Sequence, residues 1–99
     1  MGRGQGEAGA EAAVSYEIKL TRSAEKEVLG LDAAMFRRIQ AAIDILSENP
    51  RPAGVRKLRG RENEWRIRVG QFRVLYGIDD ALQRVVVYRV TDRKDVYRT

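Results

Sequence analysis

Three arginines have the residue type and the spacing that could perform chemistry on a phosphate group. Arg66 and Arg68 stand two residues apart, and Arg73 follows shortly after them. In an extended strand alternate side chains point to the same side, so Arg66 and Arg68 would project together, about 7 Å apart. A guanidinium can grip two phosphate oxygens at once and stabilise the negative charge that develops on them. We therefore predict an anion site at these three residues.

The positive charge of the chain is concentrated around these arginines. The net charge is +5, and the stretch from Arg51 to Arg73 holds eight basic residues against two acidic ones. A surface that is charged only for solubility normally mixes the two signs, so we expect this stretch to bind RNA or DNA. A merely solvated face is the alternative. The further basic residues expected to contact RNA here are Arg51, Arg56, Lys57, Arg59 and Arg61.

Two absent residue types restrict any catalysis. The 99 residues include no cysteine and no histidine, which excludes disulfide frameworks, thiolate zinc sites, cysteine nucleophiles and imidazole acid–base catalysis. We therefore expect neither a metal nor a cofactor. The sequence has no apolar run long enough for a membrane span, so we expect no membrane contact and a cytoplasmic location.

The first half of the chain is predicted to form a strand and a helical hairpin. Residues 16–20 alternate apolar and polar side chains, as a strand with one buried face does. Thr21 and Asp32 are suitable N-caps for a short and a longer helix, the second ending before Asn49 and Pro50. The positions expected in the core are Ala24, Val28, Leu31, Phe36, Ile39, Ile43 and Leu46.

The second half is predicted to form a β-meander. Residues 65–69 and 72–78 alternate on either side of a turn, and residues 84–90 are nearly all apolar, which predicts a central strand. Residues 50–61, with both prolines, are expected to be irregular. The predicted fold is α+β with the order β-α-α-β-β-β, a helical hairpin packed on a small, mostly antiparallel twisted sheet.

The chain is short enough that we expect a single domain. Residues 1–15 hold four of the nine glycines and few apolar side chains, which predicts a disordered N-terminal tail. The domain itself is expected to span residues 16–99.

Five short motifs, in order along residues 16–98, resemble the RelE branch of the RelE/ParE toxin superfamily. They are Glu48-Asn49-Pro50-Arg51-Pro52, Lys57-Leu58-Arg59-Gly60, Trp65-Arg66-Ile67-Arg68-Val69-Gly70, Phe72-Arg73-Val74-Leu75-Tyr76 and Arg93-Lys94-Asp95-Val96-Tyr97-Arg98. The resemblance implies a RelE-like fold and a toxin of a type II toxin–antitoxin system. It further implies a metal-independent endoribonuclease that cleaves mRNA in the ribosomal A site, and a cognate acidic antitoxin that inhibits it.

The resemblance also implies roles for single residues. Those implied as catalytic are Arg66, Arg68, Arg73, Arg93 and Tyr97, and those implied as further contacts to RNA or the ribosome are Lys94 and Arg98. In such an enzyme the 2′-hydroxyl of the RNA attacks the adjacent phosphorus. The arginines would stabilise the extra charge on the phosphoryl oxygens, and a tyrosine would be catalytic or would stack on a base.

The sequence departs from the pattern of the family at two places. Arg66 and Arg68 stand where relatives often carry lysine, and because an arginine stays protonated, Arg66 is a poor general base. We therefore expect Tyr97 to orient or deprotonate the 2′-hydroxyl, because neighbouring cations lower the pKa of a phenol. Asp92 stands where many relatives carry histidine, so it is a candidate partner of Arg93, a candidate base, or a sign of weaker activity. A ParE-like toxin directed at DNA gyrase and a non-catalytic RNA-binding protein remain as alternatives.

Overall fold

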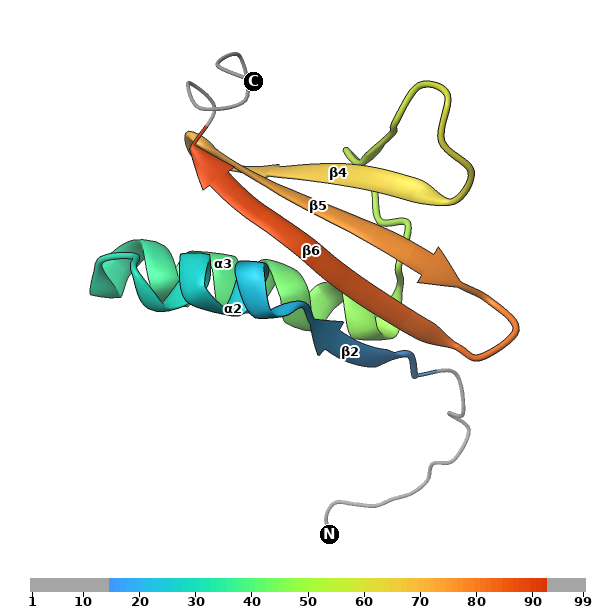
Figure 1. The fold of residues 1–99 in the computed structure, drawn as a ribbon, viewed down its shortest axis with the longest axis horizontal. Helices are drawn as coiled ribbons and strands as arrows, with labels where there is room; N and C mark the ends of the chain where they lie inside the picture. The colour runs from blue at the N-terminus through green and yellow to red at the C-terminus, as the bar shows by residue number, and fades with distance from the viewer. Residues whose placement is uncertain (1–14, 93–99) are drawn as a thin grey trace, which may run out of the picture.

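The computed structural model describes residues 15–92 of the chain. Two helices lie against one face of a five-stranded sheet (Figure 1). The elements are β2 (Glu17–Leu20), α2 (Arg22–Leu29), α3 (Ala33–Glu48), β3 (Arg56–Lys57), β4 (Glu64–Val69), β5 (Phe72–Asp79) and β6 (Arg84–Asp92). The predicted α+β fold with a helical hairpin on a mostly antiparallel sheet is confirmed.

Both helices begin at the side-chain caps that the sequence predicts. The Thr21 hydroxyl accepts a hydrogen bond from the Ala24 N–H at 3.2 Å, and the Asp32 carboxylate accepts one from the Met35 N–H at 2.8 Å. Such caps satisfy backbone donors that have no partner within the helix. They fix where each helix starts and therefore which side chains face the sheet.

The strands are arranged in the order β2-β6-β5-β4-β3. β2 is parallel to β6, and the other neighbouring pairs are antiparallel. β6 therefore lies inside the sheet along Arg84–Val87, where β2 and β5 flank it. This agrees with its nearly continuous apolar sequence.

The core lies between the helices and the inner face of the sheet, the face toward the helices. α3 contributes Ile39 and Leu46, which are fully buried, and β5 contributes the fully buried Tyr76. The Tyr76 hydroxyl donates a 2.7 Å hydrogen bond to the carbonyl oxygen of Pro50 and so ties the end of the α3 segment to the sheet. The other buried apolar residues are Ala24, Val28, Ile43, Val69, Val74, Ile78, Val85, Val87 and Val90.

Two local predictions are wrong. The stretch 50–61, predicted as irregular, contains β3, which pairs with β4 and, at two residues, is too short to show an alternating pattern. Phe36, predicted in the core, is 36% exposed. Met35 packs against the core in the first turn of α3 instead, because it lies four residues before Ile39 on the same side of the helix.

Candidate nucleic-acid interface

The first row of arginines crosses the sheet beside a tight turn. Arg68 of β4 lies directly opposite Arg73 of β5. Only Gly70 and Gln71 separate the two strands, and Gly70 has a φ of +61°, which glycine adopts without steric cost. Because Val69 points into the core, the flanking Arg68 points to the outer face, which is the face of the sheet away from the helices.

A second row of arginines crosses the same outer face. Arg56 of β3 lies opposite Arg66 of β4, two residues before Arg68. A hollow of about 290 Å³ is lined by Arg56, Arg66, Arg68 and Gly54, with no acidic side chain among these lining residues. Three arginines from two strands therefore line one hollow, the arrangement that an anion site requires.

Arg73 shares the outer face but differs from its neighbours in exposure. The sequence predicts three arginines on an exposed face, yet Arg73 is only 7% exposed, so the prediction of exposure is wrong for this residue. β5 is the middle strand, so Arg73 lies between Arg68 of β4 and the equally buried Thr91 of β6. Neighbours on both sides restrict its side chain before any ligand arrives.

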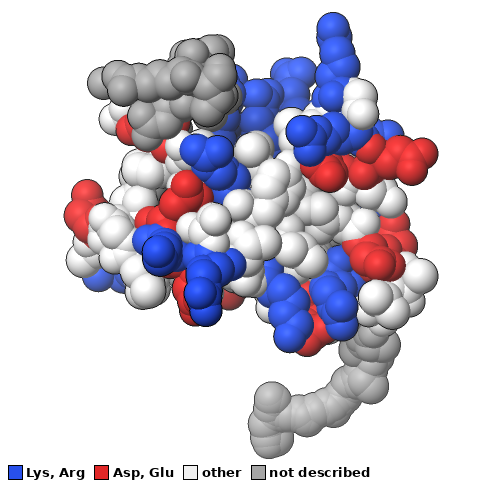
Figure 2. Space-filling view, in the orientation of Figure 1, with Lys and Arg blue, Asp and Glu red and all other residues white. Residues whose placement is uncertain are grey.

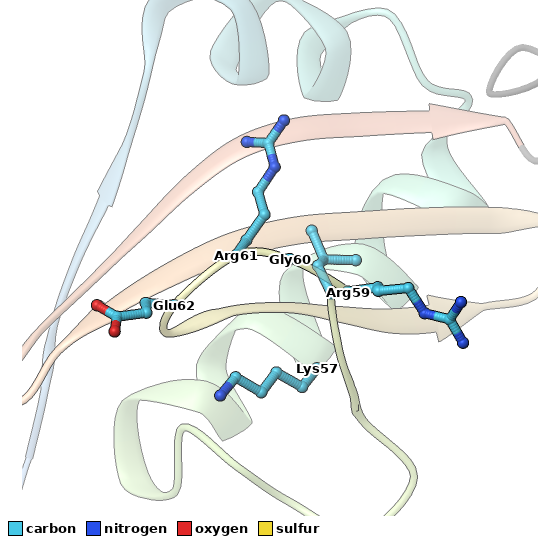
Figure 3. Close-up of a pocket in the computed structure, with 6 residues that line it drawn as sticks. Lys57, Arg59, Gly60, Arg61 and Glu62 are labelled. Atoms are coloured by element: carbon cyan, nitrogen blue, oxygen red, sulfur yellow. The ribbon is translucent and has the colours of Figure 1, made fainter.

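A larger hollow, of about 480 Å³, lies in the loop before β4 and is a weaker candidate. Its lining includes Lys57, Arg59, Arg61 and Glu62. Figure 3 shows that the basic side chains point in different directions. Arg61 is also paired, since its Nη1 lies 3.1 Å from Oε1 of Glu64. The loop supplies positive charge near the outer face but has no converged set of donors.

The distribution of charge over the whole molecule agrees with this placement. Figure 2 shows lysine and arginine side chains gathered along the top of the view, over β4 and the loop that precedes it. Basic and acidic side chains alternate over the lower part of the same view. Mixed signs are normal for a solvated surface, whereas a concentration of one sign attracts an oppositely charged partner.

Arg51, predicted to contact RNA, lies apart from these arginines. Its two Nη atoms donate to the two carboxylate oxygens of Asp80 at 3.3 and 2.9 Å, beyond the end of β5 far from Arg73. Its guanidinium carbon is 5.3 Å from the centre of the Trp65 ring. Hydrogen bonds from Arg51 and then from Tyr16 lower the pKa of the Asp80 carboxyl. Arg51 thus has internal partners, and its contact with RNA stays a prediction.

Arg38 is a basic residue that the sequence reasoning missed. It lies on α3, yet a Cβ on Gly70 would be only 3.1 Å from its Nη1, so its guanidinium rests against the turn between β4 and β5. Within residues 15–92 it has no ion pair. Arg38 thus brings positive charge from the helical layer to the end of the sheet that carries Arg68 and Arg73. Nothing in the sequence relates a helix position to a turn 32 residues later.

Four predicted site residues lie outside the described part of the chain. They are Arg93, Lys94, Tyr97 and Arg98. None of the helices in the described part is long and apolar enough to cross a membrane.

The chain matches a known protein family over most of its length. The family model described as the ParE toxin of type II toxin–antitoxin systems, parDE, matches residues 18–97. The chain belongs to the RelE/ParE toxin superfamily. Toxin RelG of Mycobacterium tuberculosis is 31% identical over 84 residues, which cover 84% of this chain and 97% of that protein. The family resemblance of the sequence motifs is thereby confirmed.

Two solved structures agree with this assignment. The archaeal RelE–RelB complex of Pyrococcus horikoshii has a TM-score of 0.72 and 27% identity, covering 80% of this chain and 96% of that chain. The toxin–antitoxin complex RelBE2 of Mycobacterium tuberculosis has a TM-score of 0.71 and 30% identity, covering 82% of this chain and 94% of that chain. The outer face with its arginines is therefore a surface of a type II toxin.

Proposed function

We propose that this toxin is a ribosome-dependent endoribonuclease that cleaves mRNA in the ribosomal A site and so inhibits translation. The convergence of Arg56, Arg66 and Arg68 on one hollow, with Arg73 held beside them, supports this proposal. Bidentate guanidinium groups suit the phosphodiester backbone of single-stranded RNA. The similarity to proteins named RelG and RelE favours the same branch of the superfamily.

The proposed reaction requires charge stabilisation more than any special nucleophile. The 2′-oxygen of the RNA bonds to the adjacent phosphorus, and the bond from phosphorus to the 5′-oxygen breaks. The products are a 2′,3′-cyclic phosphate and a 5′-hydroxyl, and the proton lost by the 2′-hydroxyl is balanced by one gained at the 5′-oxygen. Arg68 and Arg73 stabilise the charge on the non-bridging oxygens, and the restricted Arg73 does so with little reorganisation.

Proton transfer is assigned to Tyr97, which lies outside the described residues. In this proposal its phenol removes the 2′-proton, because cations nearby favour the phenolate. Asp92 ends β6 opposite Phe72, at the same end of the sheet as the turn beside Arg68 and Arg73. Asp92, the last described residue before Arg93, thus lies at the end of the sheet that carries Arg68 and Arg73.

We further propose that a cognate antitoxin inhibits the toxin by covering the outer face. Relatives of this chain have been solved as toxin–antitoxin complexes. The outer face carries the excess positive charge, so an acidic segment of the antitoxin would complement it and occlude the arginines. The proposed location is the cytoplasm, where the mRNA and the ribosome are found.

The ParE branch supplies a second candidate function, inhibition of DNA gyrase without nuclease chemistry. The observation in its favour is that the matching family model is the one named for ParE toxins. A converged arginine set on the outer face favours the nuclease, because an inhibitor that acts only by binding gyrase has no need to stabilise a phosphoryl transition state. A non-catalytic RNA-binding protein would keep the same arginines without cleaving.

Primer extension on mRNA in a translating extract separates the three functions. The wild-type toxin should produce cuts at A-site codons that need active ribosomes, and Arg73→Ala and Tyr97→Phe should each abolish them. Arg37→Ala is the matched control, since Arg37 is an exposed arginine of α3. Gyrase-dependent DNA breaks without mRNA cuts would replace the proposal by the ParE function, and ribosome binding without cuts would replace it by the non-catalytic one. Full cleavage by Arg73→Ala would contradict the mechanism.

A further inference from the structure

A tyrosine that the proposed reaction does not use lies on the outer face beside the arginines. The Tyr88 hydroxyl, on β6, donates a 2.9 Å hydrogen bond to Oε1 of Glu64, on β4. β5 lies between these two strands. The Tyr88 side chain must therefore extend across β5 over the outer face to reach its partner. Tyr88 is half-buried, so the residue is not closed off from solvent.

An irregularity in β6 explains this placement. Tyr76 of β5 pairs with Val87, while its neighbour Leu75 pairs with Arg89, so Tyr88 is an extra residue without a direct partner on β5. Such a bulge changes the direction of the side chains that follow it. The Arg89 side chain reaches α2, where its Nε donates to a carboxylate oxygen of Glu27 at 3.0 Å.

The strand that Tyr88 crosses carries a glycine between Glu64 and β6. Gly77 lies opposite Glu64 on one side and Val86 on the other, and it contributes no side chain to the outer face there. Glu64 is held from two sides, by Tyr88 and by Nη1 of Arg61 at 3.1 Å. Both contacts use Oε1, so Oε2 has acceptor capacity that these two contacts do not fill. Burial and then the hydrogen bond to Glu64 raise the pKa of Tyr88 to about 12, so its hydroxyl remains a donor at neutral pH.

We propose that the Tyr88 ring is a stacking platform for one unpaired base of the RNA and that Glu64 accepts hydrogen bonds from the edge of that base. This inference rests on the proposed function, because it names a further contact of the same RNA. Aromatic side chains on open sheet faces bind bases in this way with little dependence on sequence. The Glu64 carboxylate adds a preference among the bases. Adenine, cytosine and guanine carry an amino group on the hydrogen-bonding edge that would face Glu64, and uracil does not.

The position of the platform fits the phosphate hollow. Glu64 and Arg66 are alternate residues of β4, so their side chains leave the outer face about 7 Å apart. A base on Tyr88 therefore has its own backbone beside the hollow lined by Arg56, Arg66 and Arg68. The strands hold the platform and the phosphate site at a fixed separation, so one nucleotide occupies both.

Binding of short single-stranded RNA tests this inference without requiring cleavage. The probe is an oligonucleotide with 2′-O-methyl groups, measured by fluorescence anisotropy with and without one abasic position. We expect Tyr88→Leu to weaken binding of the intact RNA about tenfold and Tyr88→Phe to change it less than about twofold. The abasic position should weaken binding to the wild type and add no further loss in Tyr88→Leu. Glu64→Gln should reduce the preference for an amino-bearing base over uracil.

Tyr16→Leu is the matched control for these variants. Tyr16 is another half-buried tyrosine that donates to a carboxylate, that of Asp80 at 2.8 Å, but it lies before β2 and away from the hollow. Its substitution should leave RNA binding unchanged. Wild-type binding by Tyr88→Leu, or equal losses for intact and abasic RNA, would overturn the inference. If the wild-type toxin produces no A-site cuts while the Tyr88 effects hold, the nuclease proposal fails and the stacking platform stands.

Discussion

Arg68 lies directly opposite Arg73 in the antiparallel pair of β4 and β5. Like charges in directly opposite positions destabilise a sheet, by a few tenths of a kcal/mol to about 1 kcal/mol. A sheet optimised for stability alone would place a β-branched or oppositely charged residue at one of these positions. The pair therefore reduces the stability of the sheet, and the proposed anion site is the function that this loss would serve.

Replacing Arg68 should change stability and function in opposite directions. We expect Arg68→Thr to raise the midpoint of thermal unfolding by about 2–4 °C, because about 0.5 kcal/mol of repulsion is removed. The same variant should lose most RNA binding and cleavage. Arg59→Thr is the control for the unfolding midpoint, since Arg59 is an exposed loop arginine outside the strands. An unfolding midpoint lower than that of the wild type would show that Arg68 contributes to stability.

The salt dependence of RNA binding should distinguish Arg56 from Arg51. Each phosphate contact contributes about 0.7 to the slope of log affinity against log salt for single strands. Arg56→Ala should therefore reduce this slope by roughly 0.7. Arg51→Ala should leave the slope unchanged and lower thermal stability, because Arg51 pairs with Asp80 at the other end of β5. Equal reductions in both variants would show that Arg51 also contacts RNA.

The sequence predicts those parts of the site that follow from local periodicity. Alternation along β4 and β5 places Arg66, Arg68 and Arg73 on one face, and the caps Thr21 and Asp32 set the helices. The burial of Arg73 could not be predicted, because it depends on which strand lies in the middle of the sheet.

The other unpredicted features are contacts between segments that are distant in the sequence. The pairing of Arg51 with Asp80 joins residues 29 positions apart, and the contact of Tyr88 with Glu64 joins residues 24 positions apart. Pairs at such separations leave no periodic pattern. Tyr88 is further obscured because its bulge interrupts the alternation of β6, so it resembles one more apolar residue in an apolar strand.

Removing the buried hydroxyl of Tyr76 should loosen the start of residues 50–61, the stretch that follows α3. Tyr76→Phe deletes the 2.7 Å hydrogen bond to the carbonyl of Pro50 and leaves that acceptor without its partner, which should lower the free energy of unfolding by about 1–2 kcal/mol. Tyr16→Phe removes a similar bond near the surface and should cost less. Chemical denaturation of both variants checks this difference. An equal loss of unfolding free energy in the two variants would mean that burial does not strengthen the contribution of the Tyr76 hydrogen bond to stability.

Two glycines with left-handed backbone allow a matched test of the turn beside Arg68 and Arg73. Gly70 and Gly60 have φ values of +61° and +76°, so alanine at either position should cost about 1 kcal/mol of backbone strain. A Cβ at Gly70 would also press on Arg38 at 3.1 Å, whereas a Cβ at Gly60 meets nothing within 4 Å. Gly70→Ala should therefore weaken RNA binding by displacing Arg38, and Gly60→Ala should not. Similar RNA affinities for the two variants would show that the position of Arg38 does not matter.

Stability at acid pH should depend on the carboxyl of Asp80. Hydrogen bonds from Arg51 and then Tyr16 lower its pKa in the folded state below the ordinary value of 3.8. The folded protein therefore favours the ionised carboxyl, and this contribution is present above about pH 4 and is lost as the pH falls through the lowered pKa. Asp80→Asn should be less stable than the wild type at pH 6, and the difference should shrink toward pH 2.

Glu17 is a second carboxyl that contributes to acid sensitivity, because its pKa is lowered in the folded state as that of Asp80 is. Glu17 has a lowered pKa as well, caused first by its hydrogen bond from Arg84, so the wild type and Asp80→Asn both retain an acid-sensitive contribution from this residue. Thermal unfolding of Asp80→Asn, Glu17→Gln and the double variant from pH 2 to 7 isolates each contribution. The two losses should add, since the two pairs share no residue. A difference in thermal stability between the wild type and Asp80→Asn that stays constant from pH 2 to 7 would show that the charge of Asp80 does not stabilise the fold.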